Sequence, residues 1–278
     1  MAHPHAKDLD PYTSPRAFYG SELRRLREAA GLSQDGLGER AFCSGTYIGQ
    51  LEVGTRRPQT DLSQTFDGIL GSGEHLHRLS KLARKSKHPD YFADAAELEK
   101  LAVSLCEFSP MLVPGFLQTE GYARALIRAA MPLAPEEEVE GHVATRLARG
   151  RRLLGPNGPD VWAIVHEAAL RVPVGGAEVM RGQLEHIAET VRERRAIVQV
   201  QPFAAGAHQL MMGVMLLMAF DDAPPVAYAE GAHTGQLIED PALVAQCRAS
   251  YDLARAAALS LTASLELIEA TAKEHQAS

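Results

Sequence analysis

The stretch from Leu32 to Pro58, LSQDGLGERAFCSGTYIGQLEVGTRRP, constrains the fold of this chain more than any other segment. Ser33 is a good N-cap for one short helix, and Ser44 is a good N-cap for a second, which Gly54 ends. The apolar positions expected to face inward are Leu37 and Ala41 in the first helix, and Tyr47 or Ile48 with Leu51 in the second. The pattern therefore predicts two short amphipathic helices joined by a tight turn.

Three further helical patterns surround this pair. The first runs from Ala17 to Gly31, the fourth has its apolar stripe between Leu62 and Leu70, and the fifth covers Glu74 to Lys87. Residues 1–14 are rich in proline and polar residues without apolar periodicity, so we expect a flexible arm there. Residues 15–88 are predicted to form an all-α domain of five helices.

Two short helices joined by a tight turn have the dimensions of a helix-turn-helix, whose second helix enters the major groove of DNA. Small hydroxylated residues at the start of the second helix can reach bases or phosphates, and a glutamine one turn later can pair with adenine. Arginines in the following loop are natural phosphate clamps. The predicted DNA-binding residues are Gln34, Ser44, Gly45, Thr46, Tyr47, Gln50, Arg56 and Arg57.

Two alternatives accompany this interpretation. The five helices can form a small bundle without a DNA partner, in which the arginines from Arg24 to Arg27 are only a solvated face. Glu52 is expected to be an intradomain partner of Arg57 or Arg56 rather than a base reader. Tyr47 can equally belong to the core.

The segments LRRLREAAGLSQ (Leu23–Gln34) and TYIGQLEVGTRRP (Thr46–Pro58) resemble the Cro/C1-repressor, or XRE, family of DNA-binding domains. The resemblance implies a five-helix domain that binds double-stranded operator DNA, usually as a homodimer. Two positions depart from the family pattern: Gly38 stands where alanine is usual, and Phe42 stands at or near the left-handed turn glycine. An internal glycine is expected to weaken its helix by about 1 kcal/mol.

The net charge of -7 over 278 residues is unexpected for a DNA-binding protein until the chain is divided near Asp90. Residues 1–90 hold 13 Lys and Arg against 11 Asp and Glu, and the remainder holds 15 against 24, so the two parts carry +2 and -9. Phosphate attraction is local, and a mild positive excess on one domain is compatible with DNA binding.

The three cysteines, Cys43, Cys106 and Cys247, lie far apart without CxxC spacing, so neither a disulfide framework nor a zinc site is suggested. The sequence has no run of about 18 apolar residues, and its N-terminus lacks the apolar core of a signal peptide. We therefore expect a cytoplasmic protein without a membrane partner, associated with the nucleoid when bound to DNA.

The composition changes beyond His88 and Pro89, where helical and strand patterns mix. Helices are expected over 93–108, 119–130, 135–154, 176–195 and 241–272, and strands over 161–166, 197–201, 214–220 and 226–230. The last two strands are predicted to form a hairpin. Residues 89–274 should thus form a mainly helical α+β domain with a small, largely antiparallel sheet, serving regulation and dimerisation.

This C-terminal part resembles that of actinobacterial XRE regulators of the WhiJ-like or antitoxin-like group. The matching segments are VPGFLQTEGYARALI, HEAALR, VGGAEVMRGQLEHI, VQVQPFAAGAH and PPVAYAEG, in this order. The resemblance implies regulation of differentiation or secondary metabolism, and control by a small protein encoded nearby. It implies no catalytic activity.

Enzyme motifs are missing from the sequence, and no catalytic residue, cofactor or metal site is predicted. The segment starting at His166 lacks the second histidine of HExxH, there is no phosphate-binding GxxxxGK[ST], and few lysines follow Lys87 to serve as a base. The most site-like segment is Gln201–His208, a Gly/Ala-rich loop after a strand, where backbone groups are open to a ligand. Its candidate ligand- or partner-binding residues are Phe203, His208 and Met212.

The sequence as a whole predicts a dimeric transcription regulator, a repressor or an activator, that binds operator DNA and is controlled through its C-terminal domain by a small protein or ligand. Two alternatives stay open. One is an antitoxin-like interaction module that sequesters a small partner protein, and the other is a repressor that senses a small molecule.

Overall fold

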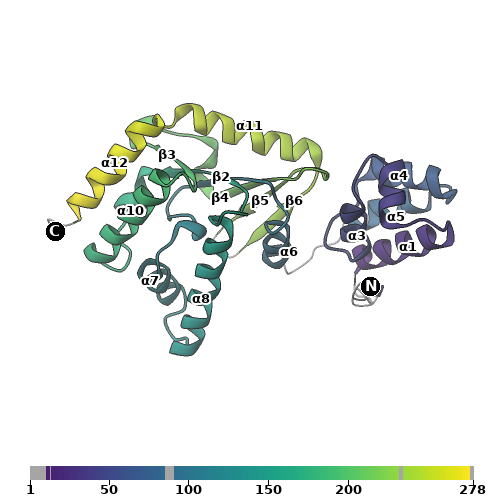
Figure 1. Ribbon diagram of the computed structural model, residues 1–278, viewed down its shortest axis with the longest axis horizontal. Helices are drawn as coiled ribbons and strands as arrows, with labels where there is room; N and C mark the ends of the chain where they lie inside the picture. Colours follow the sequence, from purple (N-terminus) through teal and green to yellow (C-terminus); the bar gives the residue numbers. More distant parts are fainter. Residues whose placement is uncertain (1–10, 13, 85–90, 232–233, 276–278) are drawn as a thin grey trace. The chain divides into compact units, whose positions relative to one another are not determined.

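The computed structural model describes residues 11–12, 14–84, 91–231 and 234–275, and the predicted arm over 1–14 lies mostly outside them. The chain divides into two compact units (Figure 1). The first comprises residues 1–94 with Asp221–Pro224, and the second comprises the rest. Within the described residues, no helix combines the length and apolar character needed to cross a membrane.

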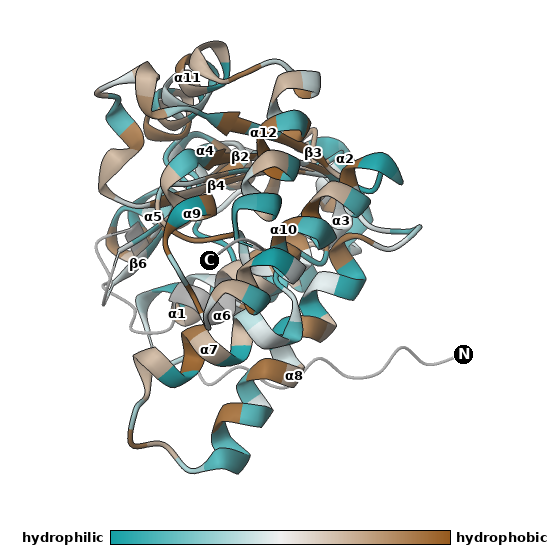
Figure 2. Ribbon diagram, turned by 90° about the vertical axis from the view of Figure 1, so that its left-hand side faces the viewer, coloured by the Kyte–Doolittle hydropathy of each residue, from teal (hydrophilic) through white to brown (hydrophobic). Residues whose placement is uncertain are grey.

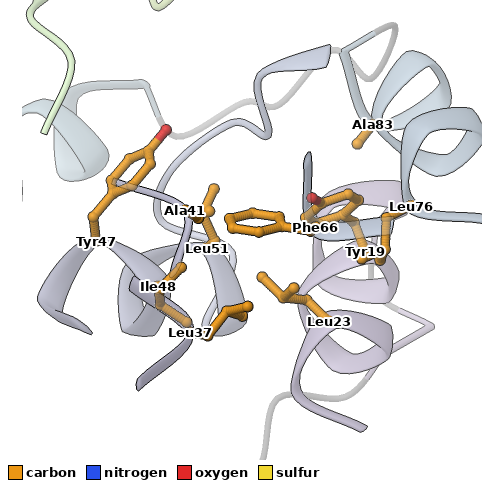
Figure 3. Close-up of a cluster of buried hydrophobic side chains, with 10 residues drawn as sticks. All are labelled: Tyr19, Leu23, Leu37, Ala41, Tyr47, Ile48, Leu51, Phe66, Leu76 and Ala83. Carbon is orange, nitrogen blue, oxygen red and sulfur yellow. The ribbon is translucent and has the colours of Figure 1, made fainter. Parts of the chain in front are cut away.

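The described part of the first unit is helical, as the sequence predicts. Its helices are α1 (Pro15–Ala29), α2 (Gln34–Arg40), α3 (Gly45–Glu52), α4 (Thr60–Leu70) and α5 (His75–Arg84), followed along the chain by α6 (Tyr91–Leu98). Figure 3 shows their shared core, in which Phe66 of α4 lies among side chains from the other helices. Its buried members include Tyr19, Leu23, Leu37, Tyr47, Ile48, Leu51 and Leu76. Burial of these side chains holds α2 and α3 against α1.

The second unit is built on a mixed sheet, and its α+β class agrees with the expectation. Six strands of the described chain are ordered β3-β2-β1-β4-β5-β6. They are β1 (Ser104–Ser109), β2 (Asp160–His166), β3 (Ile197–Gln201), β4 (Val214–Ala219), β5 (Val226–Glu230) and β6 (Gly235–Ile238). The pairs β1–β2 and β2–β3 are parallel, and the other three pairs are antiparallel. The predicted hairpin is β4–β5, whereas β6 was not expected.

Helices cover both faces of this sheet (Figure 1). They are α7 (Glu120–Ala130), α8 (Glu136–Leu153), α9 (Glu167–Arg171), α10 (Ala177–Arg192), α11 (Pro241–Ala257) and α12 (Leu261–Glu274), with 3-10 turns η1 (Gly115–Leu117), η2 (Phe203–Ala205) and η3 (Gln209–Met212). Tyr251 of α11 packs against Phe108 and Ile164 on one face and donates its hydroxyl proton to the Trp162 carbonyl. Figure 2 shows hydrophobic residues along β2 and β4, as expected for strands covered on both sides.

The helix predicted over 93–108 is wrong in its second half. The structure ends α6 at Leu98 and places Ser104–Ser109 as strand β1, between β2 and β4. Nearly all residues of β1 are buried, so the strand shows no alternation of apolar and polar residues. Sheet pairing therefore overrides a local pattern that favours a helix.

The single long helix expected over 241–272 is also wrong, because the chain breaks between α11 and α12. Ser260 caps α12, its hydroxyl accepting from the Ala263 N–H. The N–H of Leu259 donates to the Val200 carbonyl over 2.9 Å, and the Val200 N–H donates to the Ser264 hydroxyl over 2.9 Å. The break thus supplies hydrogen bonds to the outer edge of β3.

Candidate nucleic-acid interface

The two helices predicted from Leu32 to Pro58 are α2 and α3, and serine side chains start both. The Ser33 hydroxyl accepts from the Gly36 N–H at 2.9 Å, and the Ser44 hydroxyl accepts from the Tyr47 N–H at 3.0 Å. Each bond satisfies one backbone donor that a helix N-terminus leaves without a partner. Ser44 therefore lies at the start of α3, as expected.

The turn between α2 and α3 is tight because glycines allow close backbone approach. A Cβ atom on Gly38 would lie 2.5 Å from the Cys43 carbonyl oxygen, and one on Gly45 would lie 1.8 Å from Asp35 Oδ1. Phe42 adopts the left-handed conformation with φ 56°, and its side chain is 97% exposed. The left-handed turn position therefore holds a phenylalanine here, and the packing of Gly38 outweighs its low helix propensity.

Replacing Gly38 with alanine is expected to destabilise the first unit by about 1–3 kcal/mol, because the added methyl group overpacks against backbone atoms. Helix propensity alone predicts that this substitution stabilises the unit. The matched control is Gly68→Ala on α4, where a Cβ meets no atom within 4 Å, and a stabilisation of about 0.5–1 kcal/mol is expected. Urea denaturation followed by far-UV circular dichroism measures the change in the free energy of unfolding for both variants. If both variants are stabilised, or both destabilised, the packing argument is contradicted.

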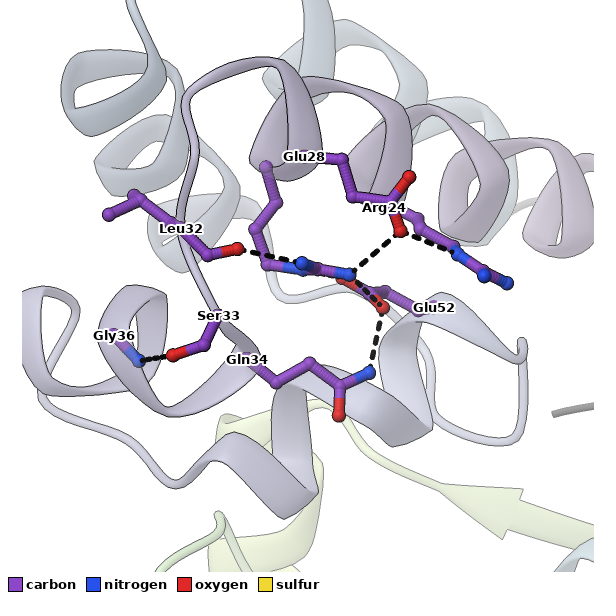
Figure 4. Close-up of polar contacts among 8 residues, drawn as sticks. Arg24, Glu28, Leu32, Ser33, Gln34, Gly36 and Glu52 are labelled. Carbon is purple, nitrogen blue, oxygen red and sulfur yellow. Dashed lines mark hydrogen bonds and ion pairs between the residues drawn. The ribbon is translucent and has the colours of Figure 1, made fainter. Parts of the chain in front are cut away.

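A buried ion pair fixes α1, α2 and α3 around this turn (Figure 4). The Arg27 guanidinium donates to both carboxylate oxygens of Glu52, with 3.1 Å between Nη2 and Oε2, and to the Leu32 carbonyl over 2.8 Å. Gln34 Nε2 donates to Glu52 Oε2 over 2.8 Å. The hydrogen bond to Glu52 is the largest cause that raises the pKa of Arg27.

The partner of Glu52 is therefore Arg27, and not Arg56 or Arg57 as expected from the sequence. Glu52 has a partner within its own unit, which agrees with the expectation. This partner is Arg27 of α1, which the bundle alternative places on a solvated face. Arg27 and Glu52 are 25 residues apart, and no local spacing rule connects them. The sequence indicates the burial of Arg27 only indirectly, because Arg27 lies among the apolar positions Leu23, Leu26 and Ala30.

Helix α3, the predicted recognition helix, has one buried face and one more open face. Gly45 and Tyr47 are buried, and Tyr47 packs in the core of the unit. Thr46 is exposed and Gln50, one turn later, is half-buried. The Gln50 Oε1 atom is buried and has no hydrogen-bond partner among the described residues. Thr46 and Gln50 lie on the same helix face because they are four residues apart.

The two loop arginines differ in exposure. Arg56 is fully buried, and its guanidinium carbon lies 5.2 Å from the centroid of the Tyr47 ring, within the range of a cation–π interaction. Arg57 is half-buried. Of the two predicted phosphate clamps, Arg57 is therefore the more accessible, and Arg56 supports the packing of Tyr47.

The predicted C-terminal residues lie after strand β3. Phe203 and Met212 are exposed, and His208 is half-buried with its ring edge-on to Phe108 at a centroid distance of 5.1 Å. His166 lies beside them, its ring centroid 5.9 Å from that of His208. The structure thus brings Phe203 and His208 together with His166 at the end of β2.

Comparison with known proteins adds two findings. A family model described as a domain of unknown function, DUF5753, matches residues 92–270, and a model described as a helix-turn-helix domain matches residues 19–79. No curated protein and no solved structure matches the chain. The helix-turn-helix match contains α2 and α3 entirely, which supports DNA as a partner of this unit.

Proposed function

Because this chain belongs to the DUF5753 family and carries a helix-turn-helix domain, we propose that it is a transcription regulator that binds operator DNA through α3. The observation that carries the proposal is the two-sided recognition helix. Its inner face packs in the core, while Thr46 and Gln50 lie on the other side. Hydroxyl and amide groups at this spacing suit hydrogen bonds to base edges in the major groove.

The other predicted contacts have supporting roles in this proposal. Ser44 and Gly45 place the positively polarised N-terminus of α3 near a phosphate. Gln34 orients Glu52 through its amide nitrogen and keeps an amide oxygen for a phosphate-bound water or base. Arg57 contributes phosphate attraction, and so binding should depend on salt.

We further propose that the protein binds as a homodimer to a roughly palindromic operator and represses transcription. One helix-turn-helix unit reads one half-site, and a dimer reads two half-sites about 34 Å apart. The resemblance to the WhiJ-like group supports control by a small protein or ligand acting through the second unit. Such control requires that the effector bind one arrangement of the two DNA-binding units better than another.

Selection of genomic fragments bound by the full-length protein tests the DNA-binding proposal and yields the site and its symmetry. Thr46→Ala and Gln50→Ala are each expected to lower affinity for the selected site by about 5- to 150-fold, the loss of about 1–3 kcal/mol of base contact. Arg57→Ala should weaken binding to all sequences and lower the salt slope by about 1. Fluorescence anisotropy at several salt concentrations measures these effects.

The matched controls for this experiment are Thr65→Ala and Gln64→Ala, the same side-chain changes at exposed positions of α4. They are expected to leave DNA affinity unchanged. If the full-length protein shows no salt-sensitive DNA binding, or if the α3 variants bind as tightly as the α4 variants, the recognition role of α3 is wrong.

A further inference from the structure

The three parallel strands β1, β2 and β3 end at one edge of the sheet, and chemically active side chains gather there. Strand β2 ends at His166 and β3 ends at Gln201, and these residues are partners in the parallel register. Adjacent strands lie about 4.8 Å apart, and register partners project from the same face. The segment after β3 returns along this edge with Phe203 and His208.

Gln201 is the unusual member of this group. Its side chain is 0% exposed, and neither Oε1 nor Nε2 has a hydrogen-bond partner among the described residues. Gln199, two residues earlier on the same face, has partners for both ends of its amide. Its oxygen accepts from Trp162 Nε1 over 2.9 Å, and its nitrogen donates to the Leu259 carbonyl over 2.8 Å. A buried amide with no partner is costly, which points to a partner that is supplied from outside the chain.

Two imidazoles lie at the same end of the sheet: His166 is the register partner of Gln201, and the His208 ring lies beside that of His166. Nδ1 of His166 accepts from the Ala168 N–H over 3.2 Å, which leaves the proton of a neutral ring on Nε2. Nδ1 of His208 is buried and has no hydrogen-bond partner in the described part of the chain. Burial is the largest cause that lowers the pKa of both histidines, and it favours the neutral form of both rings.

Aromatic rings contact both imidazoles. Phe203 meets His166 edge-on at a centroid distance of 5.3 Å, and its own side chain is 54% exposed. Phe108 meets His208 edge-on from the other side. Met211 and Met212 are also exposed in the same segment. Flat apolar surface beside hydrogen-bonding groups is typical of a small-molecule site.

The carboxylate of Glu167, next to His166 in the chain, is already paired. Glu167 accepts from the Phe203 N–H over 3.0 Å and from Arg171 Nε over 2.8 Å. Among the described residues, no group of three His, Cys, Asp or Glu side chains is placed to hold a metal ion. The group therefore offers hydrogen bonds without charge, which favours an uncharged ligand.

We propose that Gln201, His166 and His208 form a binding site for an uncharged planar nitrogen heterocycle. The Gln201 amide presents a donor and an acceptor side by side, which matches the donor–acceptor edge of a purine or of a carboxamide-bearing ring. The imidazoles supply the remaining hydrogen bonds, and Phe203 covers the ligand ring. Binding of this ligand does not depend on DNA recognition. Only a role of the ligand as an effector of DNA binding rests on the proposed function.

Isothermal titration of the full-length protein with adenine, nicotinamide and benzoate tests this site without DNA. At least one of the two uncharged heterocycles is expected to bind with a Kd below about 1 mM, while the anionic benzoate is not. Gln201→Leu should weaken that binding by about tenfold or more, because the amide hydrogen bonds are lost. Gln246→Leu, the same change at an exposed position of α11, should leave it unchanged.

His208→Leu provides a second variant whose side chain is only half-buried, and the unfolding transition of each variant shows that it is folded. The proposal is overturned if neither heterocycle binds the wild-type protein, if benzoate binds as tightly, or if both folded variants bind like wild type. Because no DNA is present, any of these results leaves the operator-binding proposal standing. A failure to bind DNA likewise leaves this site testable.

Discussion

Replacing Glu52 with alanine is expected to destabilise the helix-turn-helix unit by about 3–5 kcal/mol, because it leaves the buried Arg27 guanidinium without its carboxylate partner. The same change releases the Gln34 amide and loosens α3 from α1. Since α3 holds the proposed base-reading residues, DNA affinity should fall together with stability. The expected loss is a large fraction of the stability of a typical domain.

Trp162, the only tryptophan of the chain, makes this measurement specific, since it lies in the second unit. Far-UV circular dichroism reports the helices of both units, and tryptophan fluorescence reports the second unit. Chemical denaturation of Glu52→Ala should therefore shift the part of the circular dichroism transition that comes from the first unit and leave the tryptophan fluorescence transition in place. Glu28→Ala, which removes an exposed partner of the same arginine, should cost at most about 1 kcal/mol. Glu52→Leu combined with Arg27→Leu should recover much of the lost stability.

Equal effects of Glu52→Ala and Glu28→Ala would show that the buried pair does not hold the three helices together. A shift of the tryptophan transition equal to that seen by circular dichroism would place the effect in the whole chain rather than in the first unit.

Replacing Glu107 with glutamine is expected to stabilise the second unit at alkaline pH. Glu107 lies in the central strand β1, and burial, the largest cause, raises the pKa of its carboxyl group to about 7. Arg149 is close enough to oppose this shift, but its Nε and Nη2 atoms donate to Glu99 at 2.7 Å and 2.6 Å. The arginine that most opposes the raised pKa of Glu107 thus pairs with another carboxylate.

The raised pKa fixes the sign of the pH dependence. Protonated Glu107 is compatible with burial, so its contribution is fully present below the unfolded pKa of about 4.5 and is lost as pH rises through about 7. Between pH 5 and pH 8.5 the wild-type protein should lose about 2–3 kcal/mol relative to Glu107→Gln. Glutamine mimics the protonated side chain and does not titrate.

Urea denaturation monitored by Trp162 fluorescence at both pH values gives this difference directly. Glu97→Gln removes an exposed carboxylate, which pairs with Lys100, and its effect should change by less than about 1 kcal/mol over the same range. A stability difference between wild type and Glu107→Gln that is constant with pH would contradict a titrating buried carboxyl group.

The helices of the first unit could be predicted because their signals are local. Ser33, Ser44 and Gly71 mark helix ends, and the apolar residues between them follow the helical period. Strand β1 could not be predicted, because its partners β2 and β4 lie far along the sequence and both of its faces are buried. The break at Ser260 is likewise made by bonds to β3.

The candidate sites also combine features that local sequence predicts with features that only the folded chain shows. That Ser44 caps α3 and that Thr46 lies outward follow from sequence spacing alone. Sequence spacing does not show which charged residues are buried, because the burial of Arg27 and Arg56 depends on side chains from other segments. The sequence places Gln201 at the start of the site-like segment, but its lack of a hydrogen-bond partner is visible only in the folded chain.

The break between α11 and α12 also limits how copies of this protein can associate. An outer strand normally offers unused backbone groups to which a strand of another molecule can add. Here Leu259 and Ser264 already occupy the hydrogen-bonding groups of Val200 at the β3 edge. Strand addition at this edge, whether in a dimer or in an aggregate, must first displace the start of α12, so assembly is directed to other surfaces.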